Sequence, residues 1–315
     1  MGKDEPVVGG QAVIEGVMMR RGDRIATAVR KPDGITVRKE TFPSITKRIP
    51  FLGWPFMRGA VSLFETMYIG TRSLIYSANE AADEDDEENV ELSTWHIFIA
   101  VGGSLLFAIG LFVLLPYMAT TFIGIQEKSD PIIFNLVDGI IKLIILIAYI
   151  LLIGQMSDIR RVFQYHGAEH KSVHAYEHRK TLTPQEAQRY PTAHVRCGTS
   201  FLLIVILVGV VIFSFIPVIV SAAYPAIDTV NPFMRYSILF LARIAMLPVI
   251  AGISYEWLQF TPRLSKKSIL YTLALPGLFV QRLTTREPTS DQLEVAIEAI
   301  KAVLPQDAAK AKKDS

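Results

Sequence analysis

The sequence predicts a mainly α-helical membrane protein with about four transmembrane helices, additional interfacial or re-entrant helices and a small N-terminal β-hairpin segment. Three observations predict this fold class. Half of the 315 residues are hydrophobic and the mean hydropathy is +0.33. Most of the apolar residues gather in four runs of about the 20 residues that a bilayer-spanning helix needs. Near the N-terminus, a Pro-Asp-Gly turn separates two β-prone runs.

Residues 1–50 are expected to form a β-rich segment on the cytoplasmic side. The β-prone runs 25–30 and 35–41 flank Lys31-Pro32-Asp33-Gly34, which pre-sets the angles of a tight turn. This pattern predicts a hairpin. The apolar run 9–20, which begins with two glycines, is expected to be one further strand with tight ends.

Residues 51–78 are apolar but contain three charges spaced seven apart, Arg58, Glu65 and Arg72. Seven residues are close to two helical turns, so the three charges share one face of a helix. We therefore expect an amphipathic helix in the membrane interface; a span is the alternative, which the charges disfavour. Residues 79–95 include the acidic run 80–91 and are expected to be a solvated linker.

The four long apolar runs define a transmembrane domain over residues 96–256. Positive charge is concentrated in the loop 157–198 and in the C-terminal tail, whereas the two short connections 126–130 and 224–232 hold one lysine between them. By the positive-inside rule, both termini and this loop face the cytoplasm. The predicted spans are His96–Ile125, Pro131–Met156, Thr199–Ala223 and Phe233–Glu256.

After the last span, residues 257–304 are expected to form a cytoplasmic or interfacial C-terminal segment, followed by a disordered tail at 305–315. The apolar stretch 268–280 is too short to cross a bilayer and is expected to be interfacial or re-entrant, with a kink at Pro276-Gly277. Capping boxes at Thr183–Glu186 and Thr289–Gln292 predict the starts of two further helices.

Five of the six histidines lie within residues 166–194, and four of them recur at intervals of four. On a helix, positions four apart share a face, so imidazoles would converge there with Glu177 in the same stripe. Convergent imidazole and carboxylate groups suit a borderline divalent metal, with zinc as the first choice. Residues 166–170 also match the pattern H-x-x-E-H, in which two histidines bind zinc and the glutamate activates water.

The preferred ligand set is His166, His170 and a third ligand from His194, Cys197 or another segment. Glu169 is expected to act as general base or to hydrogen-bond a ligand from outside the ligand set. Glu177 is too far from His166 to share one ion, because eleven residues of straight helix span about 16 Å. Gly167 lies inside the motif and weakens a helix by roughly 1 kcal/mol relative to alanine. His174 and His178 are interpreted as bystanders.

Other interpretations of these residues stay open at this point. The histidines could sit among interfacial polar groups or sense pH. Cys197, the single cysteine, could be an inert small apolar residue or part of a Cys–His nucleophile pair.

Asp138, Lys142 and Arg243 are charged residues that lie well inside the predicted spans, away from their ends. Intramembrane charges are costly and commonly face a partner or a watery cavity. We expect an ion pair that locks two helices; the alternative is a polar path for substrate or ions.

Composition excludes several classes of protein. The net charge of +2 does not indicate a nucleic-acid partner, and the single cysteine excludes an intrachain disulfide framework. No Gly-Lys-Ser/Thr follows the N-terminal glycines, so a phosphate-binding loop and a nucleotide-dependent activity are disfavoured.

Four motifs resemble the YqhQ-like family of bacterial membrane proteins: GGQAVIEGVMMR, RVFQYHGAEHK, RCGTSF and LTTREP. The resemblance covers roughly residues 7–304. It implies a multi-pass protein of the bacterial inner membrane, in a family catalogued as a domain of unknown function and labelled a predicted metal-dependent enzyme. It also implies site roles for His166, Glu169, His170, Cys197, Glu15, Arg20, Arg286 and Glu287.

Two functional hypotheses follow from the sequence. The first is a membrane-embedded metal-dependent enzyme, a hydrolase with a cytoplasmic-face site and a lipidic or membrane-peptide substrate. The second is a non-enzymatic transporter, assembly factor or scaffold whose metal is structural or absent. In the first, the N-terminal glycine-rich segment and the Thr-Arg-Glu segment at 285–287 would fold over the site.

Overall fold

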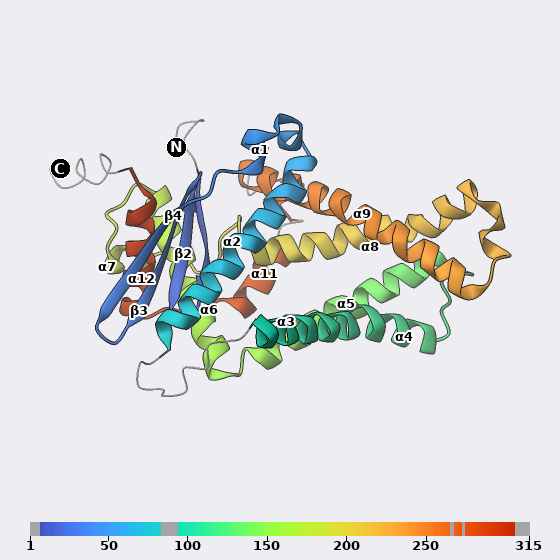
Figure 1. The fold of residues 1–315 in the computed structure, drawn as a ribbon, viewed down its shortest axis with the longest axis horizontal. Helices are drawn as coiled ribbons and strands as arrows, with labels where there is room; N and C mark the ends of the chain where they lie inside the picture. The colour runs from blue at the N-terminus through green and yellow to red at the C-terminus, as the bar shows by residue number, and fades with distance from the viewer. Residues whose placement is uncertain (1–6, 83–93, 265–267, 273–274, 306–315) are drawn as a thin grey trace.

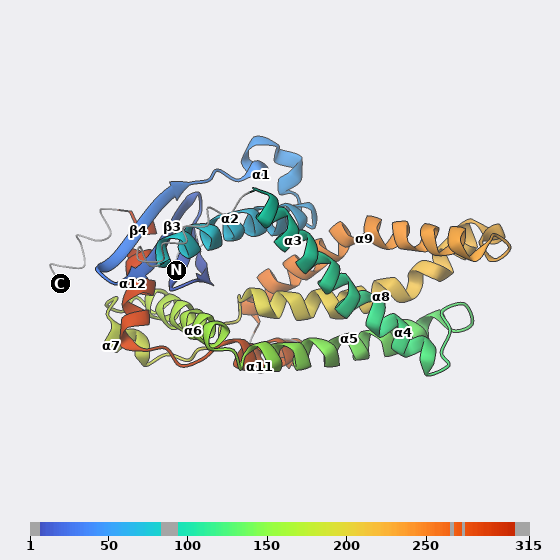
Figure 2. The ribbon, with the colours of Figure 1, turned by 60° about the horizontal axis from the view of Figure 1, so that its bottom comes forward.

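The computed structural model describes residues 7–82, 94–264, 268–272 and 275–305. A four-stranded sheet and its covering helices occupy one end of the molecule, and long apolar helices extend from there to the other end (Figures 1 and 2). The expectations for residues 83–93 of the acidic linker and for 306–315 of the tail lie outside the described residues.

The N-terminal segment forms an antiparallel sheet in the order β1-β2-β3-β4. The predicted hairpin is confirmed as β3 and β4, with Lys31 opposite Gly34 across the turn. The expectation of one strand over 9–20 was wrong, because the chain reverses at Ile14-Glu15 and Glu15 takes a φ of 50°. The strands are β1 (Val8–Val13), β2 (Gly16–Arg21), β3 (Arg24–Lys31) and β4 (Gly34–Thr41).

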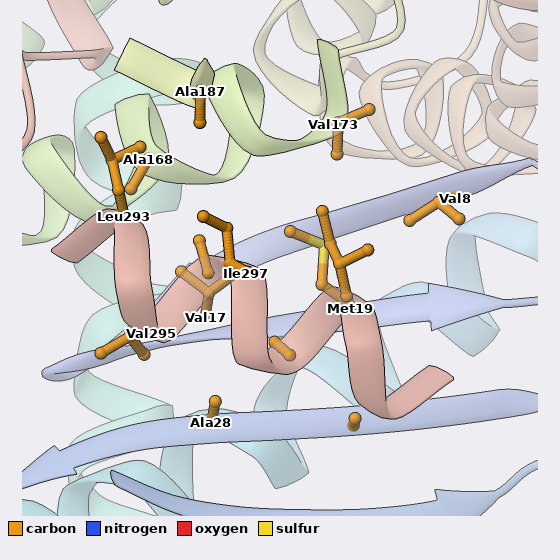
Figure 3. Packing of buried hydrophobic residues seen from close by; sticks show 14 of the residues in the cluster. Val8, Val17, Met19, Ala28, Ala168, Val173, Ala187, Leu293, Val295 and Ile297 are labelled. Atoms are coloured by element: carbon orange, nitrogen blue, oxygen red, sulfur yellow. The ribbon is translucent and has the colours of Figure 1, made fainter. Parts of the chain in front are cut away.

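Two helices close the core on one face of this sheet. Helix α12 (Ser290–Val303) begins at the predicted capping box and packs on the sheet beside α6 (Ser157–Glu177), as Figure 3 shows. The short α7 (Pro184–Gln188), capped by Thr183 as predicted, adds Ala187 to the same core. The apolar face of α12 is buried almost completely, at Leu293, Ala296, Ile297 and Ile300.

Helix α2 (Met57–Ala81) turns a polar face to the protein and an apolar face outward. Glu65, Ser73 and Ser77 are buried, whereas Phe64 and Met67 are more than half exposed. This inverted pattern suits a helix whose outer side meets lipid. Its place in the membrane interface stays a prediction. A short α1 (Ile45–Arg48) and a 3-10 turn at Pro50–Gly53 precede it.

Four helical segments of the described residues are long and apolar enough to cross a membrane. The protein is therefore a multi-pass membrane protein of mainly helical fold, as predicted. The four segments are Val101–Phe122, α5 (Pro131–Ile153), α8 (Gly198–Ala223) and α9 (Pro232–Phe260).

The first span is interrupted by a π-helical stretch, Gly110–Leu114, between α3 (Thr94–Ile109) and α4 (Leu115–Phe122). Pro116 follows this stretch and has no N–H to donate to the preceding turn. A wider turn just before a proline relieves the clash of its ring with the backbone, which explains the local change of pitch.

The apolar stretch after α9 folds into α10 (Ile269–Thr272) and α11 (Leu275–Thr284), following a 3-10 turn at Thr261–Arg263. Pro276 stands in the first turn of α11, so it begins this helix instead of kinking it as predicted. Helix α11 lies against α8 and α5 and extends to the histidine helix α6 (Figure 2).

Candidate metal centre

Helix α6 carries the histidines, and the rest of the helix explains its position. Tyr165, Ala168, Val173 and Ala175 are buried in the core shared with the sheet and α12. His166 and His170 lie on another face of α6. This face is turned toward the start of α8 and the end of α11, where His166 meets Cys197 and Thr284.

Gly167 permits a close crossing of two segments. The 284–287 segment passes over α6, and the Arg286 N–H donates to the Phe163 carbonyl over 2.9 Å. A Cβ on Gly167 would lie only 2.1 Å from the Arg286 carbonyl oxygen. The glycine inside the H-x-x-E-H motif is thus required by this contact, which outweighs its cost to helix stability.

His166, His170 and Cys197 form the first cluster, with one ligand atom from each within 4.8 Å of the others. His166 Nδ1 lies 2.9 Å from the Thr284 carbonyl, and His170 Nδ1 lies against the Thr192 carbonyl. A carbonyl accepts, so each Nδ1 carries the proton and each Nε2 keeps a free lone pair. His166 Nε2 lies 3.2 Å from Cys197 Sγ.

Cys197 caps the N-terminus of α8, which brings the sulfur to the histidines. Its Sγ accepts the Thr199 N–H over 3.4 Å. The N-terminus of a helix carries partial positive charge and favours an anionic group beside it. The thiol is buried in the described structure, with 6 % of the residue exposed.

Glu169 lies beside the first cluster and beneath the N-terminal sheet. Its Oε2 is 3.3 Å from His170 Nε2, and 5 % of the residue is exposed. Strand β1 crosses over it at Gly10, where an added Cβ would meet Glu169 Cγ at 3.1 Å. The glycine-rich segment and the 284–287 segment therefore both cover this part of α6.

His174, Glu177 and His194 form a second cluster, also within 4.8 Å of one another. His194 Nδ1 accepts the Arg196 N–H over 3.3 Å, so its Nε2 carries the proton and donates to Glu177 over 3.3 Å. Glu177 also pairs with the Arg196 guanidinium, and His174 Nε2 donates to the Ala193 carbonyl over 3.0 Å. Hydrogen bonds to the Arg196 N–H and to the Glu177 carboxylate occupy both nitrogens of His194.

Burial favours the neutral form of both histidines in the second cluster. It lowers the pKa of His174 to about 4 and also lowers the pKa of His194, the latter against the charge of Glu169. A histidine with so low a pKa is uncharged between pH 5 and 8, so His174 does not titrate in the range where pH sensors work.

The structure places Cys197, and not His194, with His166 and His170. His194 precedes the start of α8 by four residues, and a backbone N–H to the Gln281 amide over 2.8 Å turns it toward Glu177. The sequence allowed either residue because both lie in one short turn. His174, interpreted as a bystander, belongs to the second cluster, and His178 is exposed at the end of α6.

The remaining candidates from the motifs form ion pairs around the site. Glu15 accepts from Arg161 over 2.6 Å and from Tyr165 over 3.2 Å, and Arg20 pairs with Glu65 at 3.2 Å. Glu287 pairs at 2.6 Å with Lys171, which is buried. Arg286 is exposed and contributes through its backbone. These residues join the sheet, α2 and α6 around the first cluster.

The intramembrane charges pair differently from the prediction. Lys142 pairs with Asp138 one turn away on α5 itself, so this pair joins no two helices. Arg243 on α9 pairs with Glu127, in the connection between α4 and α5. A long arginine side chain can extend from a span toward its end, which explains why its partner lies in a connection instead of on α5.

Sequence reasoning missed Gln281 and Thr192. The Gln281 amide is fully buried and donates to the His194 carbonyl over 2.9 Å and to Ser200 over 2.6 Å. Gln281 directly follows the apolar stretch 268–280 and precedes Arg282, so nothing in its sequence neighbours marks it as buried. Thr192 acts through its carbonyl, which any residue type supplies, so no sequence signal could identify it.

Comparison with known proteins gives two matches and one absence. A family model described as "Protein of unknown function (DUF1385)" matches residues 54–306. The chain is also 34% identical over 324 residues to the "Uncharacterized protein YqhQ" of Bacillus subtilis (strain 168), covering 96% of this chain and 93% of that protein. No solved structure matches. The resemblance predicted from four motifs is confirmed, and the chain belongs to the DUF1385 family of YqhQ-like proteins.

Proposed function

We propose that this protein is a membrane-embedded metal-dependent hydrolase whose centre, built by His166, His170 and Cys197, lies at the cytoplasmic face of the bacterial inner membrane. One observation carries the proposal: backbone carbonyls hold both Nδ1 atoms, so neither Nε2 carries the proton. The Nε2 of His166 faces the Cys197 sulfur, and the Nε2 of His170 faces the Glu169 carboxylate. Metal-binding histidines are held in this way by their second nitrogen.

The donor set fits zinc. Two imidazoles and one thiolate are ligands that zinc accepts, and N and S ligands of one tetrahedral zinc lie about 3.5 Å apart. The 3.2 Å between His166 Nε2 and Cys197 Sγ needs only a small adjustment to reach that separation. With three protein ligands, a bound zinc would supply a Lewis acid with one open position for water or substrate.

Glu169 is the proposed general base. Its carboxylate lies beside the ligand set and accepts a proton from the attacking water, which must enter within hydrogen-bond reach. The cover formed by β1 and the 284–287 segment limits the access of bulk water, so the carboxylate acts in a partly dry site.

The 3.3 Å between Glu169 Oε2 and His170 Nε2 supports a second candidate function. If Glu169 binds the ion as a fourth ligand, the site is closed, and closed four-ligand zinc sites are structural. The protein would then be a non-enzymatic membrane factor, such as a scaffold or an assembly partner.

Metal analysis of the purified full-length chain tests the proposal. Zinc per chain would be measured by mass spectrometry in wild type and in the single variants His166→Ala, His170→Ala and Cys197→Ser. Losing a ligand should lower zinc affinity by more than the ~10–100-fold that losing an outer-shell partner costs. His178→Ala is the matched control, because it removes an exposed histidine from the same helix. Equal zinc in all variants, or none in wild type, would exclude a metal centre here.

Glu169→Gln separates the two candidates. In the hydrolase, this variant retains zinc but loses turnover of ester or amide test substrates presented in detergent micelles, because the amide cannot accept the proton. In the structural alternative, Glu169→Gln loses zinc together with thermal stability.

A further inference from the structure

A cavity of about 390 Å³ lies between α5, α8 and α11. This volume falls within the ~300–1,000 Å³ that ligand pockets occupy. No charged side chain lines it within the described part of the chain, and its walls are almost wholly apolar. The wall residues that matter here are Leu143, Ile147, Leu203, Leu275, Phe279 and Val280.

The position of the cavity in the fold limits its occupant. Helices α5 and α8 are both long and apolar enough to span the bilayer, so we expect the cavity to open among lipid chains and not in water. A polar ligand would leave its hydrogen-bonding groups unpaired there. An apolar chain that enters from the bilayer loses no hydrogen bonds and fills space that side chains leave empty.

Helix α11 joins this cavity to the metal centre. Its first six residues supply Leu275, Phe279 and Val280 to the cavity wall. Its last residue, Thr284, gives its carbonyl to His166 Nδ1 over 2.9 Å. On α8, Leu203 in the wall is six residues from Cys197, or about 9 Å along the helix.

We propose that this cavity holds one acyl chain of a bilayer phospholipid, whose polar head then lies at the first cluster. The position of the lipid head group at the first cluster rests on the proposed function. The acyl-chain site rests only on the cavity. The substrate class would therefore be a membrane lipid and not a membrane peptide. An ester bond near the head group would be hydrolysed, so that the acyl or phosphoryl product gains the hydroxyl of water and the released alcohol gains its proton.

Photolabelling of the full-length chain tests this. Wild-type protein would be reconstituted in vesicles that contain a small fraction of phosphatidylglycerol with a diazirine at the end of one acyl chain. After illumination, labelled peptides would be mapped by mass spectrometry. Label should concentrate on the α11 residues 275–280 and on α8 around Leu203, above the level on other lipid-facing helices.

Two tryptophan variants make the test specific. Leu275→Trp fills the cavity from its rim and should reduce labelling there several-fold. Leu202→Trp is the matched control, because Leu202 lies on α8 outside the cavity wall, and the two leucines are similarly exposed, at 43% and 45%. Neither residue is buried, so both variants are compatible with folding, which zinc content and thermal stability would check.

The outcomes separate this inference from the proposed function. Cavity labelling that persists in His170→Ala, with zinc lost, supports a chain site that is independent of the metal. Uniform label over all lipid-facing helices, or equal labelling of wild type and Leu275→Trp, would overturn the chain site and leave the metal centre untouched.

Discussion

At the scale of single residues, the orientation of the candidate ligands depends on atoms outside the helix that carries them. His166 rests on the Thr284 carbonyl and His170 on the Thr192 carbonyl. These two segments are far from α6 in sequence, and both are held in place by Gln281, which bonds the backbone of His194. A change in either segment would therefore turn an imidazole without altering any ligand.

Gly167→Ala tests how tightly the 284–287 segment lies on α6. The added Cβ would meet the Arg286 carbonyl at 2.1 Å, which is backbone and has little room to move. Overpacking of this kind costs about 1–3 kcal/mol, and here it would also shift Thr284 away from His166. We expect a lower melting temperature in detergent and less bound zinc, measured on the same preparation.

Gly209→Ala on α8 is the control for that variant. An added Cβ there would meet Phe213 and Ile250 at ordinary contact distances, 3.9 and 4.0 Å. Alanine is the better helix former, so stability should stay equal or rise. If Gly167→Ala behaves like this control, the close crossing does not hold the site together.

At the scale of elements, two ion pairs fix helix α9. Near its end, Glu256 accepts from Arg58 of α2 over 2.6 and 2.7 Å. Near its middle, Arg243 pairs with Glu127 of the α4–α5 connection, and Glu127 is 4% exposed. The first pair is partly open to solvent, whereas the second removes a carboxylate from solvent and should matter more.

Removing one member of the inner pair should be costly. Arg243→Leu leaves Glu127 buried without its partner, and such a loss costs about 3–5 kcal/mol. The double variant Glu127→Gln with Arg243→Leu removes the stranded charge and should recover a large part of that stability. Chemical unfolding of wild type, Arg243→Leu, Glu127→Gln and the double variant in detergent would complete a double-mutant cycle.

Arg72→Ala provides the reference for an exposed pair. Arg72 pairs with Glu40 at 3.0 Å, with side chains 47% and 27% exposed. Its loss should cost less than about 1 kcal/mol. An Arg243→Leu effect as small as this would mean that Glu127 finds water or another partner.

At the scale of the whole molecule, the sheet end and the connections 123–130 and 224–231 lie at opposite ends of the spans (Figures 1 and 2). An even number of spans returns the chain to the side of the membrane on which it started. This agrees with the shared core of the N-terminal sheet and the C-terminal α12, which requires both to lie on the same side. The positive charge of the loop 157–198, which carries α6, predicts that the sheet, α6 and α12 lie on the cytoplasmic side.

Cysteine labelling would determine this orientation. In a Cys197→Ser background, single cysteines would replace Asp33, Ser129 or Thr229, all of which are exposed. We expect a membrane-impermeant maleimide to label positions 129 and 229 in right-side-out vesicles of the inner membrane, and position 33 only after permeabilisation. Labelling of position 33 before permeabilisation would invert the proposed topology and move the site to the outer face.

Local signals in the sequence determined the spans, the β3–β4 hairpin and the starts of α7 and α12. Apolar runs, turn residues and helix caps predict these elements, because in each of them the residue types at neighbouring positions favour one conformation. The same is true of the stripe of histidines on α6, which four-residue spacing places on one helix face.

Only the tertiary structure decided which groups meet. It paired His166 with Cys197 across 31 positions and with Thr284 across 118, and it gave Arg243 its partner across 116. It also explained Gly167, which looked unfavourable within a helix until Arg286 was found against it. Periodicity reports the face on which a residue lies, but contacts over such separations depend on how whole elements pack, and no local pattern records that.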